Sequence, residues 1–152
     1  MIKHMISFIV ILAAFAILPS GMANEIRSLV LVSYVGGNDV RLTTPEIRRL
    51  YLGLPTSHQP PLTAVINRTE PLLYQVFLQK ALFMSAPLYE RQLMANVVRQ
   101  GSGYRPQMYN NQQELLSTLR KQRNAVTFMW RDQLRADAGM VVVAVVWQGR
   151  VN

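Results

Sequence analysis

Residues 62–71 read LTAVINRTEP, and this stretch decides the fold class. Leu62 to Asn67 is a short, mostly apolar run, which is typical of a buried strand. The turn Arg68-Thr69-Glu70-Pro71 follows it, and proline is favoured in the first turn of a helix. Because strands that alternate with helices build layered α/β proteins, the stretch predicts an α/β domain.

The residues before this stretch predict another strand and another helix. Ser28 to Val35 is rich in β-branched residues and stops at a Gly-Gly pair, which is typical of a strand. Thr43 and Glu46 form the Thr-x-x-Glu capping pattern that starts a helix. The helix after it places four apolar side chains on one face, namely Ile47, Leu50, Tyr51 and Leu54.

Three helices and two strands are predicted after the stretch. The first helix covers 71–84 and is apolar on most sides, so we expect it to be well buried. The second runs to about Arg99 with an apolar stripe of Tyr89, Leu93, Met94, Val97 and Val98. Asn111 caps the third, which carries Leu115, Leu116 and Leu119. The strands are Ala125–Trp130 and Met140–Trp147, with a short polar turn or helix between them.

The run from Val141 to Val146 contains no polar residue, which predicts a central strand covered on both faces. Together the alternating elements predict a single layered α/β domain with a mostly parallel or mixed sheet. The chain shows no internal repeat and no linker that would divide it. We therefore expect one domain over residues 24–152.

The first 23 residues predict an export signal. Lys3 precedes an apolar run from Met5 to Leu18, and Gly21-Met22-Ala23 offers a small-x-small cleavage site. The run is shorter than the roughly 20 residues that a membrane span needs, although an uncleaved N-terminal anchor is the alternative. We expect cleavage after Ala23, a periplasmic location and no stable membrane insertion of the product.

Composition argues against most enzyme classes. The chain has no cysteine, which excludes disulfides, thiol catalysis and thiolate metal sites. Beyond the expected signal the chain has one histidine, His58, in a proline-rich loop, and no P-loop, G-x-S-x-G or metal-ligand motif is present. We therefore expect no enzyme activity, no metal site and no cofactor.

The charge indicates an anionic partner. Lys and Arg number 16 against 8 Asp and Glu, which gives a net charge of +8. Nearly all the basic residues are arginines, whose planar fork fits carboxylates and phosphates. The tightest groups, Arg48-Arg49 and Arg120-Lys121-Arg123, lie toward the ends of predicted helices, where cations meet the helix dipole favourably. We expect no nucleic-acid partner, because the arginines are spread over many elements and the protein is expected to be exported.

Asn67 and the turn that follows it, Arg68-Thr69-Glu70, are the best candidate for an anion site. Ligands of open α/β sheets bind beyond the C-terminal ends of strands, and a helix N-terminus favours negative charge. Arg68 can supply a bidentate fork and Thr69 a hydroxyl. Glu70 opposes an anion unless it accepts a proton from the ligand or pairs with a nearby arginine. The alternative is that Thr69 or Glu70 only caps the helix while Arg68 is solvated.

The loop from Gly101 to Arg105 is a second candidate. Its Gly-Ser-Gly sequence lets backbone N–H groups approach a ligand closely. Ser102, Gly103 and Arg105 would then close the anion site from another side. An ordinary connection between two elements is the alternative interpretation.

The order of the motifs VLVSY, TTPEIRRLYLG, LTAVINR, YQVFLQKAL, GSGYRPQ and NAVTFMW resembles the phosphate-binding-protein-like family. These are the periplasmic solute-binding proteins of phosphate ABC importers and their short relatives. The resemblance covers residues 28–147, and its most specific piece is EIRRLYLG at 46–53. It implies the fold of one lobe of a type II periplasmic binding protein, phosphate or a related oxyanion as ligand, and an ABC permease as partner.

The chain departs from the family in three ways. The family's Gly-Ala-Ile-Gly-Tyr-Val stretch is replaced by the residues from Asn124 to Met129. The family's Arg-x-Asp/Glu-x-Ser-Gly-Thr turn is matched only by Arg68 and Glu70. Full-size members have two lobes, whereas this chain is long enough for about one. Two functions therefore stay open. The protein is either a solute-binding module for uptake or sensing, or a non-catalytic domain that docks on another envelope protein and binds no solute.

Overall fold

The computed structural model describes residues 25–34, 40–100, 105–136 and 139–151. The predicted export signal over 1–23 lies outside these residues. The elements in chain order are β1 (Ile26–Ser33), α1 (Thr44–Tyr51), β2 (Thr63–Asn67), α2 (Pro71–Phe77), the π-helix η1 (Leu78–Leu82), α3 (Ala86–Gln100), β3 (Gln107–Tyr109), α4 (Gln112–Lys121), β4 (Ala125–Trp130), the 3₁₀-helix η2 (Arg131–Ala136) and β5 (Val141–Arg150).

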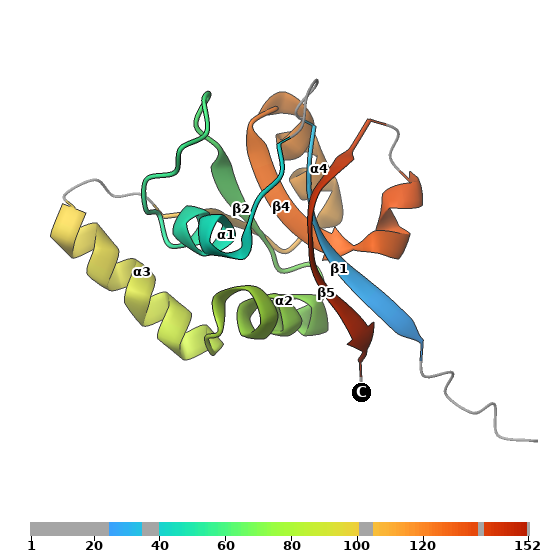
Figure 1. Ribbon diagram of the computed structural model, residues 1–152, viewed down its shortest axis with the longest axis horizontal. Coiled ribbons are helices and arrows are strands. Elements are labelled where there is room, and N and C mark those ends of the chain that lie inside the picture. The colour runs from blue at the N-terminus through green and yellow to red at the C-terminus, as the bar shows by residue number, and fades with distance from the viewer. Residues whose placement is uncertain (1–24, 35–39, 101–104, 137–138, 152) are drawn as a thin grey trace, which may run out of the picture.

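The five strands form one mixed sheet in the order β3-β2-β4-β1-β5 (Figure 1). β2 pairs in parallel with β3 and with β4. β1 runs antiparallel to both β4 and β5. The predicted α/β class with a mixed sheet is confirmed, and β4 rather than β5 is the central strand, with every residue buried.

The prediction that Val141–Val146 is a central strand covered on both faces is wrong. β5 is an edge strand, and Val145 keeps 55% of its surface exposed while Val143 keeps only 4%. Two register shifts interrupt its pairing with β1, which is typical of the bulges that protect sheet edges. The run is apolar because Val143 and its neighbours Ala144 and Val146 pack on the main core, not because helices cover both faces.

Helices cover the two faces of the sheet unequally. On one face, side chains from α1, α2 and η1 pack on alternate residues of β4 in the main core, namely Val126, Phe128 and Trp130. On the other face, Leu115 and Leu119 of α4 pack against Ala125, and Leu134 of η2 lies beside Met129. α3 extends sideways from the body of the protein, so that part of its surface stays open (Figure 1). None of the described helices is long and apolar enough to cross a bilayer.

The helix starts follow the sequence closely. At α1 the Thr43 backbone N–H donates to the Glu46 carboxylate at 2.8 Å, so the predicted capping box is confirmed. The Thr43 hydroxyl also donates to this carboxylate, at 2.7 Å, and this bond, followed by the backbone one, holds the pKa of Glu46 below its usual value. His58, from the proline-rich loop, lies with its Nε2 atom 3.4 Å from the same carboxylate. Asn111 caps α4 through its side chain, as predicted.

Two of the predicted helices differ from expectation. The helix over 71–84 changes to a π-helix after Phe77 and stops at Phe83, whose φ of 57° lies in the left-handed region. On α3 the predicted stripe is only half right, because Tyr89 and Leu93 are buried while Met94 and Val98 are 60% and 84% exposed. The sequence analysis also missed β3, which is only three residues long.

The two valines of β5 give a test of this sheet arrangement. Val143→Asp buries a charge without a partner and should lower the free energy of unfolding by several kcal/mol. Val145→Asp, on the exposed part of the same strand, should change it by no more than about 0.5 kcal/mol. Urea unfolding of both variants measures the difference. Equal losses would contradict the placement of β5 at the edge.

Candidate anion-binding site

The C-terminal ends of the parallel strands gather at one edge of the sheet. β2 ends there at Asn67, β3 at Tyr109 and β4 at Trp130. β1 is antiparallel to β4, so its first residues lie at the same edge, and Arg27 comes close to the end of β4. The edge therefore brings together the predicted turn at 67–70 and residues from three other strands.

Asn67 and Thr69 have their polar groups occupied within the protein. Asn67 is buried, and its Nδ2 donates to the Phe128 carbonyl at 3.0 Å. Its Oδ1 accepts hydrogen bonds from both the backbone N–H and the hydroxyl of Thr69, at 3.0 and 2.7 Å. The Thr69 hydroxyl has already given its one donor, and the Asn67 amide is buried, so their geometry supports a role in shaping the turn.

The helix after the turn offers fewer donors than expected. α2 spans only seven residues before the chain becomes a π-helix. Pro71 at its start has no backbone N–H, and the N–H of Thr69 is already paired. An anion at this edge would consequently depend on side chains more than on the helix terminus.

Glu70 is neutralised by groups at the same edge. Its Oε2 accepts a hydrogen bond from the indole Nε1 of Trp130 at 3.0 Å, and its Oε1 lies 3.3 Å from Arg27 Nη1. The Arg27 guanidinium also stacks on the Trp130 ring, with its central carbon 4.2 Å from the ring centroid, and pairs with Asp132 at 3.6 Å. The condition that Glu70 pairs with a nearby arginine is thus met.

Arg68 has a different environment from its neighbours. Its backbone N–H donates to the Tyr109 carbonyl at 2.8 Å, which extends the pairing of β2 with β3. Its exposed guanidinium lies 5.3 Å from the centroid of the Tyr74 ring, and Nη1 is 3.9 Å from the Met108 sulfur. Among the residues that the structure describes, no carboxylate forms an ion pair with it.

Tyr74 is a residue of this site that the sequence analysis missed. It is only 7% exposed, and its hydroxyl has no hydrogen-bond partner among the described residues. Burial raises the pKa of Tyr74 above its usual value, and so does the Glu90 carboxylate, while the charges of Arg68 and Arg105 act in the opposite direction. The hydroxyl therefore lies within the field of both predicted arginines.

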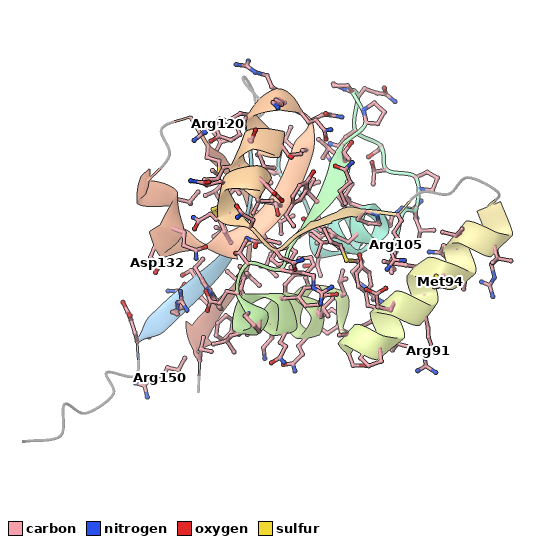
Figure 2. The ribbon with its side chains drawn as sticks, turned by 180° about the vertical axis from the view of Figure 1, so that it is seen from behind. Arg91, Met94, Arg105, Arg120, Asp132 and Arg150 are labelled. Atoms are coloured by element: carbon pink, nitrogen blue, oxygen red, sulfur yellow. The ribbon has the colours of Figure 1, made fainter. Side chains whose placement is uncertain are left out.

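Arg105 reaches this region from the segment before β3. It forms an ion pair with Glu90 of α3, and both side chains remain partly exposed. Figure 2 shows Arg105 beside α3, well apart from Arg120 on α4. The two other predicted residues of that loop, Ser102 and Gly103, lie outside the described residues.

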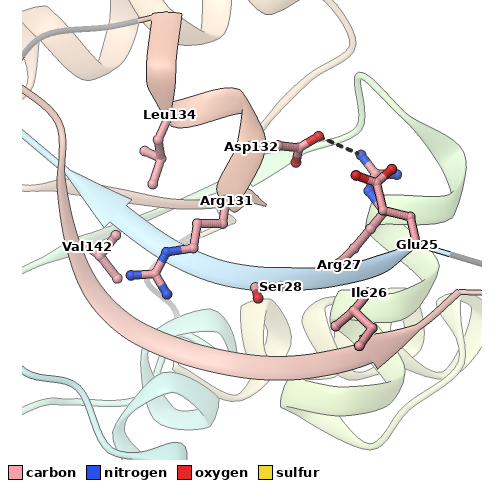
Figure 3. A pocket seen from close by; sticks show the side chains of 8 residues that line it. All are labelled: Glu25, Ile26, Arg27, Ser28, Arg131, Asp132, Leu134 and Val142. Atoms are coloured by element: carbon pink, nitrogen blue, oxygen red, sulfur yellow. Dashed lines mark ion pairs between the residues drawn. The ribbon is translucent and has the colours of Figure 1, made fainter.

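Two hollows of the described surface lie away from Arg68. Figure 3 shows one of about 430 Å³ between β1, η2 and β5, lined by Ser28 and Arg131 and bounded by the Arg27–Asp132 ion pair. Another, of about 320 Å³, includes Arg105 but lies where β2, β3 and β4 begin. Arg68 lines neither, so an anion held by it would stay partly in water. No group of three His, Asp or Glu side chains among the described residues could hold a metal ion.

Arg27, Trp130 and Tyr74 were not predicted from the sequence, for two different reasons. Arg27 and Trp130 contact Glu70 across 43 and 60 residues of chain, and no local pattern connects them. Tyr74 carried a weak signal, because it is the one residue with a polar tip on the buried face of its helix.

Comparison with known proteins adds no family assignment. No protein-family model matches the chain, and no curated protein matches it.

The contrast between Asn67 and Arg68 can be tested through stability. Asn67→Ala removes a buried side chain that bonds Phe128 of β4 and Thr69 of the turn, and it should cost about 1–3 kcal/mol of unfolding free energy. Arg68→Ala removes an exposed group without an ion pair, and it should change stability by no more than about 0.5 kcal/mol. Thermal and urea unfolding measure both. An equally large loss for Arg68→Ala would show that Arg68 is a structural residue.

Proposed function

We propose that this chain is a non-catalytic module that binds phosphate or a related oxyanion, with Arg68 and Arg105 as its charged contacts. The observation that carries the proposal is the state of Arg68. It is an exposed guanidinium without an ion pair among the described residues, at the C-terminal edge of a parallel strand pair. Ligands of open α/β sheets bind at such edges.

The neighbouring charges support this assignment. Glu70 follows Arg68 by two residues and would repel an anion if its carboxylate faced the same way. Its pairing with Arg27 and Trp130 offsets that charge. Arg68 and Arg105 then oppose the single carboxylate of Glu90, which leaves an excess of positive charge around Tyr74.

The arginine contacts indicate the size of the ligand, and the openness of the site indicates how tightly it binds. A guanidinium recognises two oxygens of a phosphate or carboxylate at once, which suits a small oxyanion. A site without an enclosing second lobe buries little of its ligand, so we expect weaker binding than in a closed pocket. The motif resemblance supports a role in the periplasm, in uptake through an ABC permease or in sensing.

A second function has its own supporting observation. α3 exposes three apolar side chains, Leu88, Met94 and Val98, and Figure 2 shows Met94 and Arg91 on this open helix. An exposed apolar group of this kind is a feature of docking surfaces. In this alternative the domain binds another envelope protein and no solute.

Calorimetric titration of residues 24–152 with phosphate, sulfate and a simple organophosphate tests the anion function. Charge-assisted hydrogen bonds contribute about 1.5–3 kcal/mol each. Arg68→Ala should therefore weaken binding by roughly ten- to a hundredfold. Arg120→Ala serves as the matched control. It also removes one positive charge, but from α4 across the sheet.

Two results would count against the proposal. Equal affinities for the parent and for Arg68→Ala would remove Arg68 from the site. Absence of heat with all three anions would favour the docking function, which a pull-down with Met94→Asp as the negative control would then examine.

A further inference from the structure

Glu90 already pairs with Arg105, a positive charge that an incoming anion would need. Its carboxylate pairs with Arg105, and a carboxylate is chemically similar to one face of a phosphate. The pair is partly exposed, so an ion from solution can compete for the guanidinium. Arg68, by contrast, has no carboxylate on it among the described residues. The two arginines of the proposed site thus differ in that one already holds an internal anion.

Tyr74 offers Glu90 another partner. A buried hydroxyl without a hydrogen bond is unfavourable, and its proton needs an acceptor. Three charged groups act on this hydroxyl, and only Glu90 among them can accept a proton, because guanidinium groups only donate. A carboxylate that left Arg105 would find at Tyr74 a donor that is otherwise unused.

We propose that the Glu90 carboxylate competes with the oxyanion for Arg105. When the oxyanion binds, it displaces this carboxylate from Arg105, and the carboxylate then accepts a hydrogen bond from the Tyr74 hydroxyl. This inference rests on the proposed function of the same site. Binding then exchanges one charged partner of Arg105 for another and adds a hydrogen bond inside the protein. Tyr74 assists binding without touching the ligand, and Glu90 weakens it.

Phosphate titrations of four proteins test the exchange, namely the parent, Glu90→Ala, Tyr74→Phe and the double variant. Removing the competitor should tighten binding by about two- to fivefold, as expected for a partly exposed ion pair. Tyr74→Phe should weaken binding in the parent and have no effect when Glu90 is absent. Glu114→Ala on α4 removes the same charge from an exposed position outside the cluster, and it should change the affinity by less than about 1.5-fold.

The remaining outcomes separate the two proposals. If the parent binds phosphate and Glu90→Ala behaves like Glu114→Ala, the exchange is wrong while the anion site stands. If Tyr74→Phe weakens binding equally with and without Glu90, Tyr74 contacts the ligand itself and the exchange is also wrong. If no variant binds phosphate, the proposed function fails and the inference with it. Tyr74→Phe should unfold no more easily than the parent, because it removes an unpaired buried hydroxyl, and this checks that the variant is folded.

Discussion

The contact of Arg27 with Trp130 and Glu70 is the constraint on which the edge of the sheet depends. It joins the start of β1, the end of β4 and the residue before α2, three segments that are distant in sequence. The indole N–H of Trp130 binds the same carboxylate, so the acid has a partner on each oxygen. One carboxylate thereby fixes the position at which β2 leaves the sheet and α2 begins.

This contact also decides the charge of the surface beside it. With Glu70 paired, Arg68 is the charged side chain of the turn that has no ion pair among the described residues, and its charge and that of Arg105 both lower the pKa of Tyr74. The Asn67–Thr69 hydrogen bonds hold the turn in place, and the N–H of Arg68 ties it to β3. In the proposed function, the side chain of Arg68 is the group that meets an anion from solution. An open site of this kind suits exchange with solvent better than tight capture.

Local patterns predicted most of the fold and about half of the candidate site. The capping box at Thr43, the cap at Asn111 and the strand ending at Asn67 depend on neighbouring residues, and each is confirmed. The position of β5 depends on pairing across the whole sheet, which an apolar run does not specify. For the same reason Arg68 and Glu70 could be singled out in the turn, whereas the partners of Glu70 and the unpaired hydroxyl of Tyr74 became visible only in three dimensions.

The most direct test of this account is the phosphate affinity of Glu70→Gln. Glutamine keeps the size of the side chain, and its one carbonyl oxygen can still accept a hydrogen bond from Arg27 or from Trp130, while the negative charge is lost. If those two residues already offset the charge and the parent binds phosphate as proposed, the affinity of the variant should stay within about twofold of that of the parent. A gain of about tenfold would mean that Glu70 faces the anion and repels it, and would contradict the account.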